Sequence, residues 1–169
     1  MIWSSHRILT GITVFALSQN ALAAMAAVSG SVFPDSLDLS LGLPHRQISH
    51  WFPMYLVPLL IPAFFFTHGW YVHHTLDYLS IFQNFDLSTF FYFLVCNWMF
   101  WFLVGCLFHI LEDVVTGYIP ITSPSKSNFC PHRFFYTGSP KETFFVMFYS
   151  FCCFLLIGYR YFVFGVFLF

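Results

Sequence analysis

The residues best suited to chemistry lie between Gly105 and Ser123, in the stretch GCLFHILEDVVTGYIPITS. His109 and Asp113 are four positions apart, so on a helix both side chains point to one face. A neutral imidazole and a carboxylate are ligands that divalent metals such as zinc take. Ionisable groups where a membrane helix meets the interface are costly and therefore indicate function. An isolated pair would also suit a polar helix end satisfied by water, so a metal site needs further ligands.

A polar segment at residues 34–50 supplies such ligands, and its prolines and glycine predict a turn-rich loop. Three or four His and Asp side chains at one depth make a zinc-type site, and an open coordination position makes it catalytic. A metal there would activate a water molecule for ester hydrolysis, and two metals bridged by a carboxylate would suit a phosphoester. The candidate residues of this segment are Asp35, Asp38, His45, Arg46 and His50.

The composition predicts an integral membrane protein. Hydrophobic residues make up 59% of the 169 positions and charged residues only 8%, whereas about a quarter of a soluble domain is charged. The net charge of -1 provides no basic patch, which argues against a nucleic-acid partner. The length fits one all-α bundle of about four spans over residues 1–169, without a separate soluble domain.

Three of the expected spans follow the polar segment, at Trp51 to about Tyr71, Leu87 to about Leu111, and Thr143 to Phe169. The second of these spans carries the chain back across the membrane, so segments 34–50 and 112–142 lie on the same side. They contain four basic residues, against none between 68 and 86, which predicts a cytoplasmic location. We therefore expect Asp35 or Asp38, His50, His109 and Asp113 to converge within roughly 5 Å. His73 and Asp77, on the opposite side, are interpreted as part of an interfacial polar turn.

Residues 1–33 leave two main arrangements open. A single helix from Ile8 to Phe33 is long enough to cross, whereas a turn at Ser18-Gln19-Asn20 would make a re-entrant helical hairpin. The hairpin is favoured because a single crossing would leave these polar side chains near mid-membrane, and because an Ala-rich second arm packs closely. A cleavable signal peptide is disfavoured, since the apolar run continues past Ala23. The choice decides where His6 lies.

Three other charged residues have candidate roles. Arg46 and Arg133 could hold a phosphate bidentately or could serve only as cytoplasmic anchors of the membrane topology. Glu112 projects about 100° round the helix from Asp113, so it is expected to act as a general base or as the partner of a ligand.

Five segments resemble, in order, the YdjM-like family of bacterial inner-membrane proteins, described as LexA-regulated and as metal-dependent hydrolases. They are SHRILTG at 5–11, GSVFPDSLD at 30–38, HRQISH at 45–50, HILEDVVTGYIPITSP at 109–124 and TGSPKE at 137–142. The arrangement is also similar, more distantly, to zinc-dependent phospholipase C. The resemblance implies an inner-membrane location and the metal ligands His6, Asp35 or Asp38, His50, His109 and Asp113. The family's PDxD motif is one residue longer here, so Asp35 and Asp38 remain alternatives, and Ser49 replaces a threonine.

The expected function is hydrolysis of a phosphoester or related ester in a lipid or membrane-proximal substrate, through one or two divalent ions, most simply zinc. The alternative is a non-enzymatic multi-pass membrane protein, either a metal-binding structural subunit or a small carrier. A carrier needs polar residues at mid-depth, where the sequence offers few. An interfacial enzyme needs them clustered at one membrane face, which is the arrangement that the loops predict.

Overall fold

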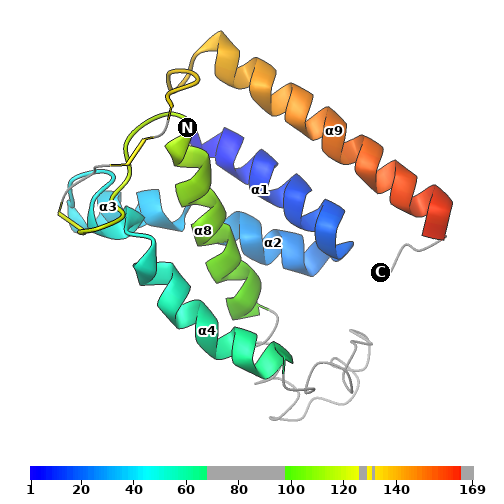
Figure 1. The fold of residues 1–169 in the computed structure, drawn as a ribbon, viewed down its shortest axis with the longest axis horizontal. Helices are drawn as coiled ribbons and strands as arrows, with labels where there is room; N and C mark the ends of the chain where they lie inside the picture. The colour runs from blue at the N-terminus through cyan, green and yellow to red at the C-terminus, as the bar shows by residue number, and fades with distance from the viewer. Residues whose placement is uncertain (68–97, 126–128, 131, 165–169) are drawn as a thin grey trace.

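The structure is a computed structural model that describes residues 1–67, 98–125, 129–130 and 132–164 (Figure 1). Within these ranges every regular element is a helix, apart from an isolated bridge between Ile119 and Phe129, which confirms the all-α prediction. The elements are α1 (Trp3–Ser18), α2 (Ala21–Gly30), α3 (Phe33–Leu41), the 3-10 helix η1 (Ile48–His50), α4 (Pro53–Thr67), α8 (Phe100–Val114) and α9 (Pro140–Phe164).

α1 and α2 form the helical hairpin that the polar residues at 18–20 predict. α1 ends because Gln19 adopts a left-handed φ of 54°, and its N–H donates to the carbonyl of Phe15. α2 begins immediately, since the side-chain oxygen of Asn20 accepts a hydrogen bond from the N–H of Ala23 at 3.0 Å. The two helices lie side by side (Figure 1). A single unbroken helix over residues 8–33 is therefore wrong.

Small residues let α2 and α8 cross at close range. A Cβ atom added at Gly105 would clash with the carbonyl oxygen of Ala27, and one added at Gly30 would clash with that of Phe102. Backbone atoms cannot move aside as a flexible side chain can, so both positions need glycine for this crossing. The crossing brings the carbonyl of Ser31, the residue directly after α2, to His109 on α8.

Residues 33–41 form α3, although the sequence predicted a loop there. Pro34 occupies the first turn, where its missing N–H costs nothing, and Asp35 complements the positive end of the helix. Gly42, at a φ of 62°, ends α3, and the N–H of Leu43 bonds to the Asp38 carbonyl at 2.9 Å. The chain then turns back to η1, so that residues 45–50 face the same end of the bundle as α3.

α9 packs along α1, and α4 packs along α8 (Figure 1). The guanidinium of Arg160 donates to the carbonyl oxygens of Ala16 and Leu17, at 2.7 and 2.8 Å. Arg160 therefore satisfies the last carbonyls of α1.

One described helix, at Pro140–Val163, is long and apolar enough to cross a membrane, and a shorter apolar helix runs over Pro53–Phe64. This is weak evidence for membrane association. The expected spans at 51–71 and 87–111 run into residues outside the described part of the chain. The polar turn with His68, His73, His74 and Asp77 lies wholly outside it. The bundle of about four spans therefore stays a prediction.

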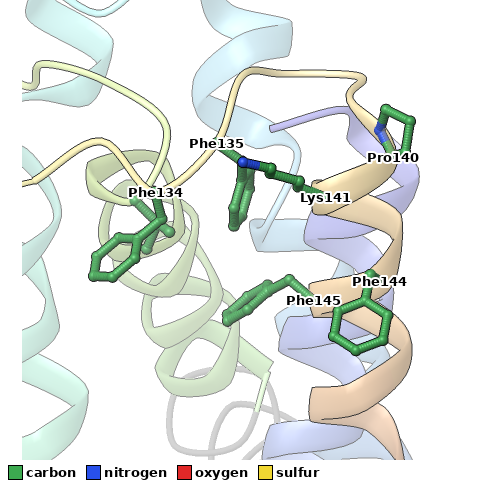
Figure 2. A pocket seen from close by; sticks show the side chains of 7 residues that line it. Phe134, Phe135, Pro140, Lys141, Phe144 and Phe145 are labelled. Atoms are coloured by element: carbon green, nitrogen blue, oxygen red, sulfur yellow. The ribbon is translucent and has the colours of Figure 1, made fainter.

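An apolar pocket of about 560 Å³ lies beside the first turns of α9 (Figure 2). Phe134 and Phe135 approach it from the loop before α9, and Phe144 and Phe145 come from α9 itself. Lys141 is the single charged residue of its lining.

Candidate metal centre

The predicted HxxxD pair lies on one buried face at the end of α8. His109 and Asp113 are both buried, and Nε2 of His109 lies 3.8 Å from Oδ2 of Asp113. Nδ1 of His109 lies 2.5 Å from the carbonyl oxygen of Ser31, which the close crossing of α2 brings there. A carbonyl can only accept, so Nδ1 carries the hydrogen and Nε2 keeps its lone pair for the interior of the site.

Asp35 from α3 and His50 from η1 complete a group of four. Nε2 of His50 lies 3.0 Å from Nε2 of His109, 3.3 Å from Oδ1 of Asp35 and 3.4 Å from Oδ2 of Asp113. Oδ1 of Asp35 lies 3.4 Å from Nε2 of His109. All four ligand atoms lie within 4.8 Å of one another, which confirms the predicted convergence.

Three of these separations, at 3.3–3.4 Å, are those expected between ligands of one tetrahedral ion, and two others are 3.0 and 3.8 Å. For metal–ligand bonds of about 2.0–2.1 Å, the edges of a tetrahedron measure roughly 3.3–3.4 Å. Oδ1 of Asp35 and Oδ2 of Asp113 are buried side-chain oxygens without a hydrogen-bond partner, and both face this group. Unpartnered buried oxygens are rare and call for a ligand. The four residues could therefore hold a metal ion.

A hydrogen-bond relay orients His50. Ser49 donates its hydroxyl hydrogen to Oδ1 of Asp38, so its oxygen accepts from Nδ1 of His50 at 2.8 Å. This again leaves Nε2 of the imidazole facing the centre. Asp38 therefore acts one step behind the ligands, as second partners of metal-binding histidines do. Of the two aspartates that the sequence left as alternatives, Asp35 belongs to the tetrahedral group.

Asp38 also belongs to a second group whose ligand atoms lie within 4.8 Å of one another, formed by Asp35, Asp38, His45 and His50. Oδ2 of Asp38 is already bonded to Nδ1 of His45 at 3.2 Å and to the N–H of Arg46 at 3.3 Å. The side chain of His45 is 57% exposed. This second group is therefore less enclosed than the first, and Asp38 already has a hydrogen-bond partner within it.

His6 lies next to the tetrahedral group. Its Nε2 is buried without a hydrogen-bond partner, 3.4 Å from Oδ1 of Asp113. Its Nδ1 lies 2.6 Å from Oε2 of Glu112, whose other oxygen accepts from the hydroxyl of Thr10 at 3.0 Å. The α-amino nitrogen of Met1 also lies 2.6 Å from Oδ1 of Asp113. The two oxygens of Asp113 thus face different partners, because Oδ1 lies towards His6 and Oδ2 lies towards His50.

Arg46 reaches the same carboxylate from the loop between α3 and η1. Its Nη2 donates to Oδ1 of Asp113 at 2.9 Å and to the hydroxyl of Thr116 at 2.8 Å. A Cβ atom at Gly117 would clash with the guanidinium of Arg46 and would lie 3.5 Å from Nη2 of Arg133. Two guanidinium groups therefore approach Gly117 beside the acidic centre.

Electrostatics favour a positive charge at the centre. Burial would raise the pKa of Asp35, but the adjacent imidazoles of His109 and His50 hold it well below its usual range. Burial also acts to raise the pKa of Asp113, and the adjacent imidazoles of His50 and His6 outweigh it and lower the pKa. Both carboxyls are therefore ionised. A proton shared by the imidazoles or a divalent cation would compensate the negative charge of these two carboxylates. Only a divalent cation would also bind to every inward-facing lone pair.

Sequence reasoning missed two of the contacts that hold these ligands. Thr10 stands four positions after His6, so its place on the same helix face was available from the spacing. The carbonyl of Ser31 carries no such signal, because any residue has one. No protein-family model, no curated protein and no solved structure matches the chain.

Proposed function

We propose that this protein is a membrane-bound, metal-dependent hydrolase of a phosphoester or related ester. The convergence of Asp35, His50, His109 and Asp113 supports this most directly, because their inward atoms lie at the mutual distances of ligands of one ion. Each histidine also has a hydrogen-bond partner at Nδ1 that leaves Nε2 free for the metal. The resemblance to the YdjM-like family and to zinc-dependent phospholipase C agrees with this.

Zinc is the ion proposed, because two imidazoles and two carboxylates in a tetrahedral arrangement suit it. His6 and Asp113 would hold a second ion. When bound, zinc supplies a Lewis acid and lowers the pKa of a coordinated water.

The remaining residues have roles that follow from their contacts. Arg46 and Arg133 would bind phosphoryl oxygens, since both guanidinium groups approach Gly117 beside the site. Both oxygens of Glu112 are engaged by His6 and Thr10, which suits the orientation of His6 better than direct action as a general base.

The proposal places this centre at the inner, cytoplasmic face of a bacterial inner membrane. α9 would cross, extended forms of α4 and α8 would add two spans, and the hairpin of α1 and α2 would be re-entrant. Basic residues in segments 34–50 and 112–142 support the orientation, because segments of this kind stay in the cytoplasm. A lipid or another membrane-proximal ester would then present its head group at the depth of the metal.

A structural metal site in a non-enzymatic membrane protein is the second candidate. Four protein ligands favour it, since structural zinc sites are closed by their ligands. A cleft of about 530 Å³ lined by Asp35 favours the hydrolase, because it gives a substrate access to one side of the centre.

Metal analysis and hydrolysis assays on the purified full-length protein test the proposal. We expect one or two zinc ions per chain, loss of metal in His109→Ala and Asp113→Ala, and retention in His45→Ala as the matched control. Hydrolysis of bis(p-nitrophenyl) phosphate should disappear with a chelator and return with zinc. Bound zinc without hydrolysis would support the structural alternative, and wild-type protein that binds no metal would reject both.

A further inference from the structure

The cleft beside the candidate metal centre is lined by both polar and apolar side chains. The polar ones belong to Asp35, Asp38 and His45, and the apolar ones include those of Trp3, Leu39 and Leu43. Its volume of about 530 Å³ is within the range of small-molecule sites.

Asp35 connects this cleft to the proposed ion. The side chain of Asp35 is 11% exposed, whereas those of His50 and His109 are 0% exposed and that of Asp113 is 1% exposed. Of the four proposed ligands, only Asp35 lines the cleft. A ligand in the cleft would therefore approach the centre from the side of Asp35.

The apolar side chains of the lining include exposed residues further from the proposed ion than Asp35. Leu39 follows Asp35 by four positions, so both project from one face of α3, with Leu39 one turn further along. Leu39 is 76% exposed and Trp3 is 41% exposed. A Cβ atom at Gly42 would contact nothing, so the end of α3 leaves the mouth of the cleft open.

We infer that the cleft binds the apolar part of an amphiphilic ester, with the ester group at the ion and the hydrocarbon chain against Trp3, Leu39 and Leu43. This inference rests on the proposed function and adds the residues that select the substrate. Exposed apolar side chains at the mouth indicate contact with the membrane rather than with water, and tryptophan is typical of that interface. The protein therefore prefers a long-chain phosphoester that enters from the bilayer over a water-soluble one.

The test compares substrates on zinc-loaded, full-length protein in mixed micelles. The measured quantity is the ratio of kcat/KM for a long-chain alkyl p-nitrophenyl phosphodiester to that for bis(p-nitrophenyl) phosphate. The double variant Leu39→Ser, Leu43→Ser should lower this ratio at least about tenfold, because it removes two apolar contacts. Leu41→Ser is the matched control, since Leu41 is 62% exposed on the same helix but does not line the cleft. An unchanged ratio in the double variant would overturn the inference.

A second readout is independent of catalysis. A long-chain phosphodiester with a diazirine on its alkyl chain should label peptides containing Trp3 or residues 39–43, and the double variant should lose most of this labelling. Labelling without hydrolysis would reject the proposed function and retain the cleft as an amphiphile site. Labelling confined to α9 would reject the cleft, whatever the protein hydrolyses.

Discussion

Two cavities of nearly equal size differ in the chemistry of their walls. The cleft at Asp35 measures about 530 Å³ and adjoins buried oxygens that have no hydrogen-bond partner. The pocket beside α9 measures about 560 Å³, is lined mainly by phenylalanine, and contributes no such atom (Figure 2). Volume therefore does not distinguish the candidate site. What distinguishes it is a group of buried His and Asp side chains, two of whose carboxylate oxygens have no hydrogen-bond partner.

The largest difference in zinc affinity between substitutions in the two cavities is expected when a proposed metal ligand is removed. His109→Ala deletes one of four inward-facing donors, so zinc affinity should fall by more than about 100-fold, beyond the effect of losing a supporting partner. Phe144→Ala, in the apolar pocket, should leave zinc content unchanged. Equilibrium dialysis with zinc measures both, and circular dichroism checks that each variant keeps its helices. Equal zinc affinity in His109→Ala and wild type would show that the four-residue group is not the metal site.

The close crossing of α2 and α8 should be the next most sensitive feature to substitution. In Gly105→Ala the new methyl group meets the carbonyl of Ala27, so α2 and α8 must separate at a cost of about 1–3 kcal/mol. The apparent melting temperature should fall by about 2–4 °C per kcal/mol. Zinc affinity should fall as well, because the carbonyl of Ser31 moves away from His109.

Gly158→Ala is the matched control for that substitution, since a Cβ atom there would contact nothing. Thermal unfolding followed by circular dichroism should show no loss for this variant. A Gly105→Ala protein as stable as Gly158→Ala would mean that the close crossing does not form.

Loss of the hydrogen bond between Ser49 and His50 should have a smaller effect on zinc affinity. Ser49→Ala removes the hydroxyl that holds Nδ1 of His50, and zinc affinity should fall about 10–100-fold with little loss of stability. Ser49→Thr keeps the hydroxyl and should restore most of the affinity. A competition titration with a chromophoric chelator distinguishes the two, and equal affinity in both variants would exclude the relay.

The smallest effect is expected in the apolar pocket. Phe144→Ser replaces a side chain that is 72% exposed, so zinc content and hydrolysis should stay within about twofold of wild type. The hydrolysis assay with the soluble phosphodiester measures this. A loss of zinc here would show that the two regions are coupled.

Local patterns in the sequence were sufficient for several features. The spacing of His109 and Asp113 determines that they share one face of a helix, whatever packs against it. The polar residues at 18–20 interrupt an apolar run, and a hairpin satisfies them through Gln19 as a C-cap and Asn20 as an N-cap. These predictions succeeded because both depend on interactions within a few residues of the chain.

Only the tertiary structure decided which groups complete the site. Asp35 and Asp38 are three positions apart on α3, so spacing could not separate them. The docking of α3 directs Asp35 to His50 and His109, and it directs Asp38 to Ser49. The carbonyl of Ser31 reaches His109 only because glycines at 30 and 105 allow two backbones to approach. Convergence of this kind depends on the relative placement of helices, which is set by packing between segments far apart in the chain.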